Sequence, residues 1–416
     1  MAHNDNQAAP LSLESPGSPK PETEDIVDTP QRGRLRRIAA FALYTIAAVL
    51  VLVLLAEGAA SVYYAFRAAF ATPPVAESLY TEYDPELGWI NLPNIYLPNM
   101  YAPGKFLRTN SQRFRNDHDF TKSVPPGKVR IICSGDSFTL GFGVDNEHTW
   151  PQQLAAHNAN LETVNMGQGG YGADQAYLWY KRDGVKLDHD IQIFAIISPD
   201  VFRMQHSAFN GYGKPVLTVD NDRVVATNVP VPRTMEVWSP RLVRAENALS
   251  NLNITRALKS VFKFTAAAPL LGSKERNEET AWILSTMLDN LAAINRAKNS
   301  VLVLAYLPTR EELNGEAGAS WRAYLAAYAR QNDLLYLDLF DDFRALPPAQ
   351  IDTLFITRAA VDFPGAAGHY TEAGNEFVAD LVYQRLLANP ETAAKLHAVS
   401  GGATPAGPAS ANPPSH

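Results

Sequence analysis

Residues 129–141 read VRIICSGDSFTLG, a mostly aliphatic run that ends in a short polar turn. The run Val129–Ser134 has the composition of a strand that is covered on both faces of a sheet. Gly135 then allows the chain to turn sharply, and Ser137 follows two residues later. Open parallel sheets place their binding crevices at the carboxyl ends of their strands. The stretch therefore predicts a strand that delivers the Ser137 hydroxyl to such an edge.

Four more short aliphatic runs follow, with helical stretches between and after them. Further strands are expected at Thr163–Met166, Ile191–Ile197, Val301–Tyr306 and Leu334–Leu339. Helices are expected at Trp150–Asn158, Ala173–Arg182, Glu279–Lys298, Ser320–Gln331 and Glu372–Leu387. Strands that alternate with helices indicate a parallel sheet between helical layers. The expected fold class is α/β, a flavodoxin-like three-layer sandwich with a central parallel sheet.

One segment, residues 201–268, interrupts this alternation. It contains PVLTV-DNDR-VVAT, two short runs rich in β-branched residues around a polar turn, which predicts a β-hairpin. Because the segment follows the third strand, we expect an insertion at the carboxyl end of that strand. Residues 80–126 carry Pro, Asn and aromatic residues without clear periodicity, and we expect them to pack onto the domain as a lead-in.

The N-terminal part contains an uncharged apolar run, Ile38–Ala56. At about 1.5 Å rise per residue a helix over this run spans roughly 28 Å, close to the ~30 Å hydrocarbon core of a membrane. Basic residues lie just before the run, at Arg32, Arg34, Arg36 and Arg37. By the positive-inside rule, residues 1–37 are expected to be a cytoplasmic arm, residues 38–60 the anchor, and the rest exported.

Two other interpretations of this run are a buried globular helix and a cleaved signal peptide. A buried globular helix is rarely so long and uncharged. A cleaved signal peptide would use the small-x-small sequence Ala69-Phe70-Ala71, but the apolar run exceeds the usual signal core and that sequence lies far beyond its end. An uncleaved anchor is the preferred interpretation.

Composition excludes several classes of function. The formal net charge of −7 provides no basic face for nucleic acid. The single cysteine, Cys133, excludes an intramolecular disulfide and a cysteine-based zinc site. No phosphate-binding glycine loop or metal-spaced His/carboxylate cluster is visible, so we expect neither cofactor nor metal. The polar, aromatic-poor residues 1–37 and 389–416 are expected to be disordered.

The turn Gly135-Asp136-Ser137, followed by an apolar residue at the end of the first strand, resembles the nucleophile motif of the SGNH/GDSL hydrolases. The resemblance implies that Ser137 is the nucleophile and that its backbone N–H is one oxyanion donor. After the second strand the family carries an asparagine, four residues and an oxyanion-hole glycine; Asn165 and Gly170 have that spacing here. Tyr83–Trp89 and Arg108–Ser111 look like the lead-in of membrane-anchored bacterial members, so the resemblance covers roughly residues 80–388.

The segment Gly368–Asn375 resembles the family's closing motif, which implies that His369 is the general base. The family usually has an aspartate two or three residues before this histidine, where this chain has Ala367 and Ala366. Asp362 is the nearest upstream carboxylate and is the candidate third residue. A Ser–His dyad oriented by a backbone carbonyl is the alternative.

A second departure follows the third strand, where the family carries Gly-x-Asn-Asp and its asparagine completes the oxyanion hole. Here Asp200 matches, but Pro199 occupies the asparagine position and has no side-chain donor. Loss of one such donor typically costs about 10²–10³ in turnover. Asn210, in the insertion, is a candidate replacement.

These features predict a serine esterase anchored in the cytoplasmic (inner) membrane by a single pass, with its catalytic domain in the periplasm or outside the cell. The resemblance implies an ester-bearing small molecule or glycan as substrate, often an acetylated cell-envelope or exported polysaccharide. Two alternatives stay open. One is an O-acyltransferase that acts on a glycan, because an acyl-enzyme does not dictate its acceptor. The other is a non-catalytic scaffold or glycan-binding protein with the SGNH fold.

Overall fold

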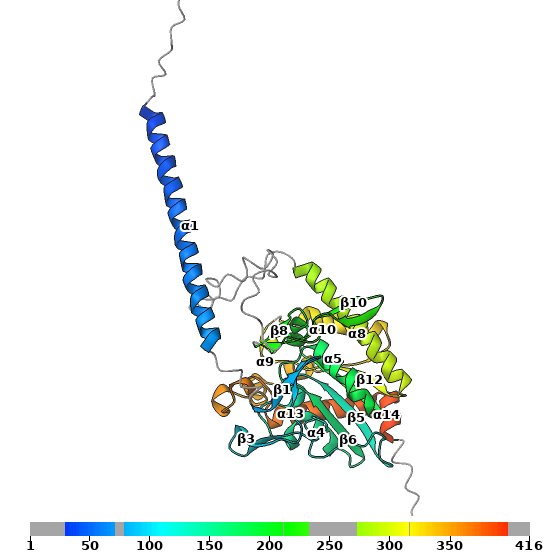
Figure 1. Ribbon diagram of the computed structural model, residues 1–416. Helices are drawn as coiled ribbons and strands as arrows, with labels where there is room; N and C mark the ends of the chain where they lie inside the picture. Colours follow the sequence, from blue (N-terminus) through cyan, green and yellow to red (C-terminus); the bar gives the residue numbers. More distant parts are fainter. Residues whose placement is uncertain (1–29, 71–78, 211, 233–272, 316, 398–416) are drawn as a thin grey trace, which may run out of the picture. The chain divides into compact units, whose positions relative to one another are not determined.

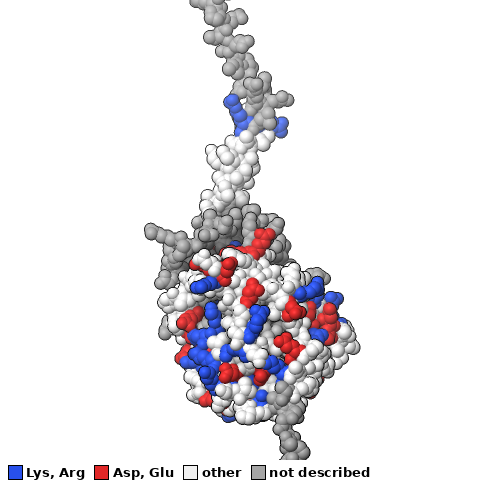
Figure 2. Space-filling view, turned by 90° about the vertical axis from the view of Figure 1, so that its right-hand side faces the viewer, with Lys and Arg blue, Asp and Glu red and all other residues white. Residues whose placement is uncertain are grey.

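The computed structural model describes residues 30–70, 79–210, 212–232, 273–315 and 317–397. Two units are distinguished, the N-terminal helix up to Phe66 and the domain that follows it. Helix α1 spans Pro30–Phe70. Its section Arg36–Tyr63 is, by length and composition, suited to cross a membrane, and none of its most apolar window is buried. Figure 2 shows this apolar stretch as white, with arginines at its N-terminal end.

The core of the domain is a five-stranded sheet. Its strands are β5 (Val129–Gly135), β6 (Leu161–Gly167), β7 (Ile191–Ile196), β12 (Val301–Tyr306) and β13 (Leu335–Asp338). All neighbouring pairs run parallel, in the order β13-β12-β7-β5-β6. β5 therefore lies inside the sheet, between β7 and β6. The predicted α/β fold with a central parallel sheet is confirmed.

Helices cover both faces of this sheet (Figure 1). One face packs against α5 (Ala173–Arg182), α8 (Ser273–Ala297) and α10 (Ala319–Gln331). The other packs against α4 (Trp150–Ala156), α13 (Glu372–Ala388) and α14 (Pro390–His397). Successive side chains of a strand point to opposite faces, so Ile132 joins the first core and Ile131 the second. Both are fully buried, and each such side chain contributes about 1.5–3 kcal/mol.

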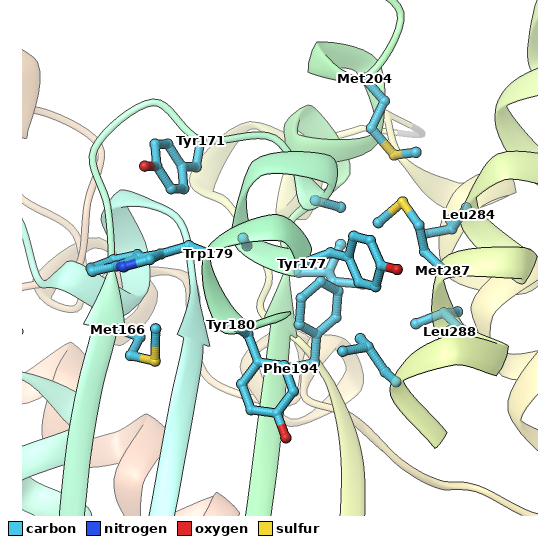
Figure 3. Packing of buried hydrophobic residues seen from close by; sticks show 14 of the residues in the cluster. Met166, Tyr171, Tyr177, Trp179, Tyr180, Phe194, Met204, Leu284, Met287 and Leu288 are labelled. Carbon is cyan, nitrogen blue, oxygen red and sulfur yellow. The ribbon is translucent and has the colours of Figure 1, made fainter. Parts of the chain in front are cut away.

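The first of these cores is rich in aromatic and methionine side chains. Figure 3 shows Tyr177 and Phe194 facing Met287 and Leu288 of α8, with Trp179 on the other side of α5. The α5 helix is thereby held against the sheet on one side and against α8 on the other. This packing fixes the segment that enters α5, which carries Gly170.

Two antiparallel hairpins precede the sheet. They consist of β1 (Thr81–Asp84) with β2 (Gly88–Asn91), and β3 (Tyr96–Ala102) with β4 (Lys105–Arg108). Leu87, Trp89 and Ile90 are buried in the first core, which agrees with a lead-in that packs onto the domain.

The described part of the insertion begins with α6 (Ser198–Arg203). It continues through β8 (Ala208–Phe209), β9 (Tyr212–Gly213), β10 (Leu217–Asp220) and β11 (Arg223–Ala226). The predicted hairpin is confirmed as β10–β11, and its turn residues Asn221 and Asp222 both have positive φ. The remainder of the expected insertion, residues 233–268, lies outside the described residues.

Short elements complete the domain. They are α3 (Ser137–Leu140), α9 (Arg310–Leu313), α11 (Phe340–Arg344), α12 (Pro348–Thr353) and 3₁₀ turns at Asn146–His148, Gly184–Lys186, Arg358–Ala360 and Pro364–Ala366. Two expectations need correction. Residues 1–37 are expected to be disordered, but helix α1 begins at Pro30, so residues 30–37 are helical. The tail was expected to be disordered from residue 389, but α14 forms over Pro390–His397 because Leu396 and Thr392 are buried against the domain.

Candidate active site

The chain turns at the carboxyl end of β5 and enters the short helix α3. Asp136 is the N-cap of α3, and its Oδ1 accepts a hydrogen bond of 2.8 Å from the N–H of Phe138. Ser137 is thus the first helical residue, and Gly141 ends the helix in the left-handed conformation. The turn delivers Ser137 to the carboxyl edge of the sheet, although only 4% of its surface is exposed.

A buried arginine fixes the far end of α3. Arg115 is inaccessible to solvent and donates to the carbonyl oxygens of Leu140 at 2.7 Å, Gly141 at 2.5 Å and Val144 at 2.5 Å. Its Nε also donates to Asn146 Oδ1. Among the described residues no carboxylate pairs with this guanidinium, so its donors serve backbone oxygens and the amide oxygen of Asn146. Sequence reasoning missed Arg115, because its partners are carbonyl groups that carry no side-chain signal.

The structure brings Ser137 and His369 together. The Nε2 atom of His369 lies 2.7 Å from Ser137 Oγ, across 232 residues of sequence. The imidazole packs beside the rings of Phe138 and Phe142, with centroid distances of 4.5 Å and 5.2 Å. With its proton on Nδ1, the imidazole accepts the Ser137 hydroxyl proton at Nε2. This is the arrangement that activates a serine for nucleophilic attack.

Asp362 is not brought to the histidine. Its side chain is exposed, and no hydrogen bond or ion pair between it and His369 occurs in the described part of the chain. The Nδ1 atom of His369 lies instead 3.3 Å from the carbonyl oxygen of Ala366. The turn Pro364–Ala366 presents this carbonyl, so the imidazole is oriented by a backbone dipole rather than by a carboxylate.

The electrostatic surroundings keep His369 neutral. Burial against aromatic rings lowers the pKa of His369 to about 4, and the negative charge of Asp136 opposes this shift only in part. A neutral imidazole is the form that accepts a proton, so His369 is available as a base throughout the neutral range.

We therefore predict an unusually acidic limb in the pH profile. A histidine with the ordinary pKa of about 6.5 would lose its base function below neutrality. With a pKa of about 4, kcat/KM for acetate release from an acetyl ester should stay nearly constant down to about pH 5 and fall only as the pH drops through about 4. Loss of half the activity near pH 6.5 would contradict this assignment.

The N–H groups of Ser137 and Gly170 are the candidate oxyanion donors. Gly170 has a φ of +79°, and a side chain there would come within 2.7 Å of the Phe209 ring, so only glycine fits. Within the described residues, the N–H groups of Ser137 and Gly170 donate no hydrogen bond. Unpaired N–H groups at a sheet edge are the kind of donor that forms an oxyanion hole.

Pro199, Asp200 and Asn210 lie in the segment that follows β7. Pro199 lies in the first turn of α6, where the missing N–H of proline has no cost. Asn210, the candidate replacement donor, is exposed in the turn between β8 and β9, with a φ of +49°. Asp200 is buried, and its Oδ2 accepts a 3.0 Å hydrogen bond from the N–H of Ile197.

A buried charge cluster lies directly behind Ser137. Nη1 of Arg203 is 2.6 Å from Asp200 Oδ1 and 3.2 Å from Asp136 Oδ2, and both carboxylates are 3% exposed. Burial and the nearby Asp136 charge raise the pKa of Asp200 well above its usual range. Sequence reasoning missed Arg203; its i,i+3 spacing from Asp200 would have indicated the pair if a helix had been expected there. Among the described residues no group of His, Cys, Asp and Glu side chains is arranged to hold a metal ion.

Comparison with known proteins gives similarity only at the level of structure. No protein-family model and no curated protein matches the chain. Similar solved structures include a member of the lipolytic protein G-D-S-L family from Veillonella parvula, with 14% identity, a TM-score of 0.33, and coverage of 62% of this chain and 97% of that chain. A lipase/acylhydrolase from Enterococcus faecalis has 12% identity, a TM-score of 0.34, and coverage of 62% and 96%. An acetyl xylan esterase, AlAXEase, has 14% identity, a TM-score of 0.32, and coverage of 62% and 98%.

Proposed function

We propose that this chain is a serine esterase in which Ser137 is the nucleophile and His369 the general base. The observation that carries the proposal is the 2.7 Å contact between Ser137 Oγ and His369 Nε2 at the carboxyl edge of the sheet. The lowered pKa of His369 supports it, because the base is unprotonated at neutral pH.

The reaction would proceed in two steps. Ser137 Oγ attacks the ester carbonyl while His369 takes the hydroxyl proton at Nε2, and the N–H groups of Ser137 and Gly170 stabilise the oxyanion. The tetrahedral intermediate expels the alcohol, which leaves with the proton from His369, and an acyl-serine remains. Water then attacks the acyl-serine with His369 again as base, which releases the acid and restores Ser137. The carbonyl of Ala366 holds the imidazole in the required tautomer throughout.

The surroundings of Ser137 support a small acyl group. The nucleophile is only 4% exposed, and the rings of Phe138 and Phe142 pack on its base. A long acyl chain would need a groove at this point, whereas an acetyl group needs little room. We therefore propose an acetyl ester as substrate, carried by an envelope or exported polysaccharide. The apolar helix α1 with its N-terminal arginines supports a membrane anchor and a domain outside the cytoplasm.

A single labelling experiment tests nucleophile and location together. A fluorophosphonate should label Ser137 both in permeabilised cells and in the purified domain. The purified domain should also cleave p-nitrophenyl acetate at least tenfold faster than p-nitrophenyl octanoate. A membrane-impermeant fluorophosphonate should also label the protein in intact expressing cells whose wall has been removed.

The outcomes separate the parts of the proposal. Labelling only after permeabilisation would contradict the location, and no labelling under any condition would contradict the nucleophile and favour a non-catalytic scaffold. Acetyl transfer to an added glycan in preference to water would favour the acyltransferase, which uses the same acyl-serine.

A further inference from the structure

A cation, Arg203, lies beside the glycine loop of the candidate oxyanion hole. Arg203 ends α6, the helix whose first turn contains Pro199. Its side chain reaches back toward the sheet edge, where Nη1 donates to the carbonyl oxygen of Tyr171 at 2.8 Å. Tyr171 directly follows Gly170, so the guanidinium lies beside the loop that holds one backbone donor.

The same guanidinium also lies beside the nucleophile. Arg203 Nη1 and Ser137 Oγ are 3.2 Å and 3.3 Å from one atom, Oδ2 of Asp136. On its other side the guanidinium packs over the ring of Phe209 at 4.9 Å, and this is the ring that a side chain at Gly170 would strike. Nucleophile, glycine loop and guanidinium therefore surround one small region.

Some N–H groups of the Arg203 guanidinium are available to bind a further acceptor. A guanidinium carries five N–H groups, and the three acceptors on Arg203 all bind Nη1. Within the described part of the chain, Nε and Nη2 have no acceptor. The side chain is 17% exposed, so it is not sealed in the core as the two carboxylates are.

The positive charge of Arg203 affects the pKa values of neighbouring groups in the site. It contributes to the lowered pKa of His369, although burial is the larger cause. Burial together with the Asp136 charge raises the pKa of Asp200, and the positive charge of Arg203 opposes this shift. A donor held in place before the reaction, in a poorly hydrated site, is the kind of group that stabilises developing negative charge.

We infer that Arg203 is a catalytic residue that donates a hydrogen bond to the oxyanion, together with the N–H groups of Ser137 and Gly170. The inference rests on the proposed esterase function. Arg203 keeps its proton throughout, because it acts as a donor to the tetrahedral intermediate and no bond to it forms or breaks. Its Nε or Nη2 would become paired when the carbonyl oxygen becomes negative.

The test combines Arg203→Met with Pro199→Asn and measures kcat and KM for p-nitrophenyl acetate. Arg203→Met should lower kcat by about 10²–10³ with little change in KM, because the lost hydrogen bond forms mainly in the transition state. Arg203→Lys should be intermediate, since an ammonium keeps the charge but not the planar fork. Pro199→Asn should raise kcat at least tenfold in the Arg203→Met background, and much less in the wild type. Gln205→Ala is the control and should behave as wild type, because Gln205 lies two residues beyond Arg203 and its amide donates to Asn277 at the surface.

A purely structural role for Arg203 predicts different results. Arg203→Met leaves Asp136 and Asp200 without their cation, so the protein could lose activity by unfolding. The double variant Arg203→Met/Asp200→Asn removes one of the two carboxylates and should unfold at nearly the wild-type temperature while keeping the kcat defect. Wild-type kcat in that folded variant would overturn the inference, and so would failure of Pro199→Asn to restore any activity.

The results that would contradict the proposed esterase function differ from those that would contradict the role of Arg203. If fluorophosphonate does not label Ser137 in the wild type and no ester is cleaved, the esterase assignment is wrong and this inference falls with it. If the wild type is labelled and active but an Asn210 variant carries the kcat defect, the esterase stands and the donor is Asn210.

Discussion

Ser137→Ala is expected to abolish ester hydrolysis by the purified domain, with kcat lower by about 10⁴–10⁶. The reason is the 2.7 Å contact with His369, which places the Ser137 hydroxyl where the base can take its proton. Ester cleavage should be followed as acetate release, and the background rate without enzyme sets the floor.

His369→Ala should cost nearly as much, and the double variant little more, because nucleophile and base act as one unit. Ser134→Ala is the matched control: Ser134 lies in β5, the strand that leads to Ser137, and it is buried. Among the described residues its hydroxyl accepts a single long hydrogen bond, of 3.5 Å, from Gln192. We expect this control to keep its activity. Ester cleavage that survives Ser137→Ala would show that another group performs the reaction.

The strand pattern could be predicted because burial on both faces is a local property of sequence. The expected strand Ile191–Ile197 differs from β7 by one residue, and the expected strand Val301–Tyr306 agrees with β12. Each of these runs is continuously aliphatic or nearly so, and turn residues separate it from the next helix. The pairing order along the sheet, β13-β12-β7-β5-β6, is not local and came only from the structure.

The third partner of His369 shows where proximity in sequence misleads. Asp362 is the nearest upstream carboxylate, but the short turn Pro364–Ala366 brings a carbonyl to the imidazole and leaves the carboxylate exposed. Without that carboxylate, the imidazolium formed during the reaction has Asp136 as its main negative neighbour. A carbonyl can set the tautomer of the imidazole but supplies no net charge to stabilise the imidazolium. This site therefore relies more on hydrogen-bond donors to the oxyanion than a site with a carboxylate beside its histidine.

Contacts between distant segments could not be predicted from the sequence either, because they depend on how the chain folds in space. Arg203 meets Asp136 across 67 residues, and Arg115 meets Leu140 through a backbone oxygen that any residue would offer. Helix α14 was missed because its sequence, PETAAKLH, has few apolar residues, yet Leu396 and Thr392 suffice to dock it. Amino-acid composition describes a segment as a whole, whereas the docking of a helix depends on the few residues of the face that contacts the domain.

Arg115→Met is expected to produce the largest loss of stability among the substitutions considered for this domain. The guanidinium is fully buried and bonded to the carbonyl oxygens of Leu140, Gly141 and Val144, among others. Methionine fills much of the same volume but leaves these oxygens unpaired, and each orphaned acceptor costs about 1–3 kcal/mol. Because the losses overlap, we expect the free energy of unfolding to fall by about 3–5 kcal/mol.

The measurement is denaturant unfolding followed by tryptophan fluorescence, with Arg108→Met as the control. Arg108 is exposed and stacks over the Tyr96 ring at 4.8 Å, so its removal should cost at most about 1 kcal/mol. Equal losses in the two variants would refute the role given to Arg115. Any Arg115→Met protein that stays folded at low temperature should also have a lower kcat, since the released carbonyls belong to the end of α3 and the turn that follows it. Ser137 begins that four-residue helix, so a shift at one end moves the nucleophile relative to His369 at the other.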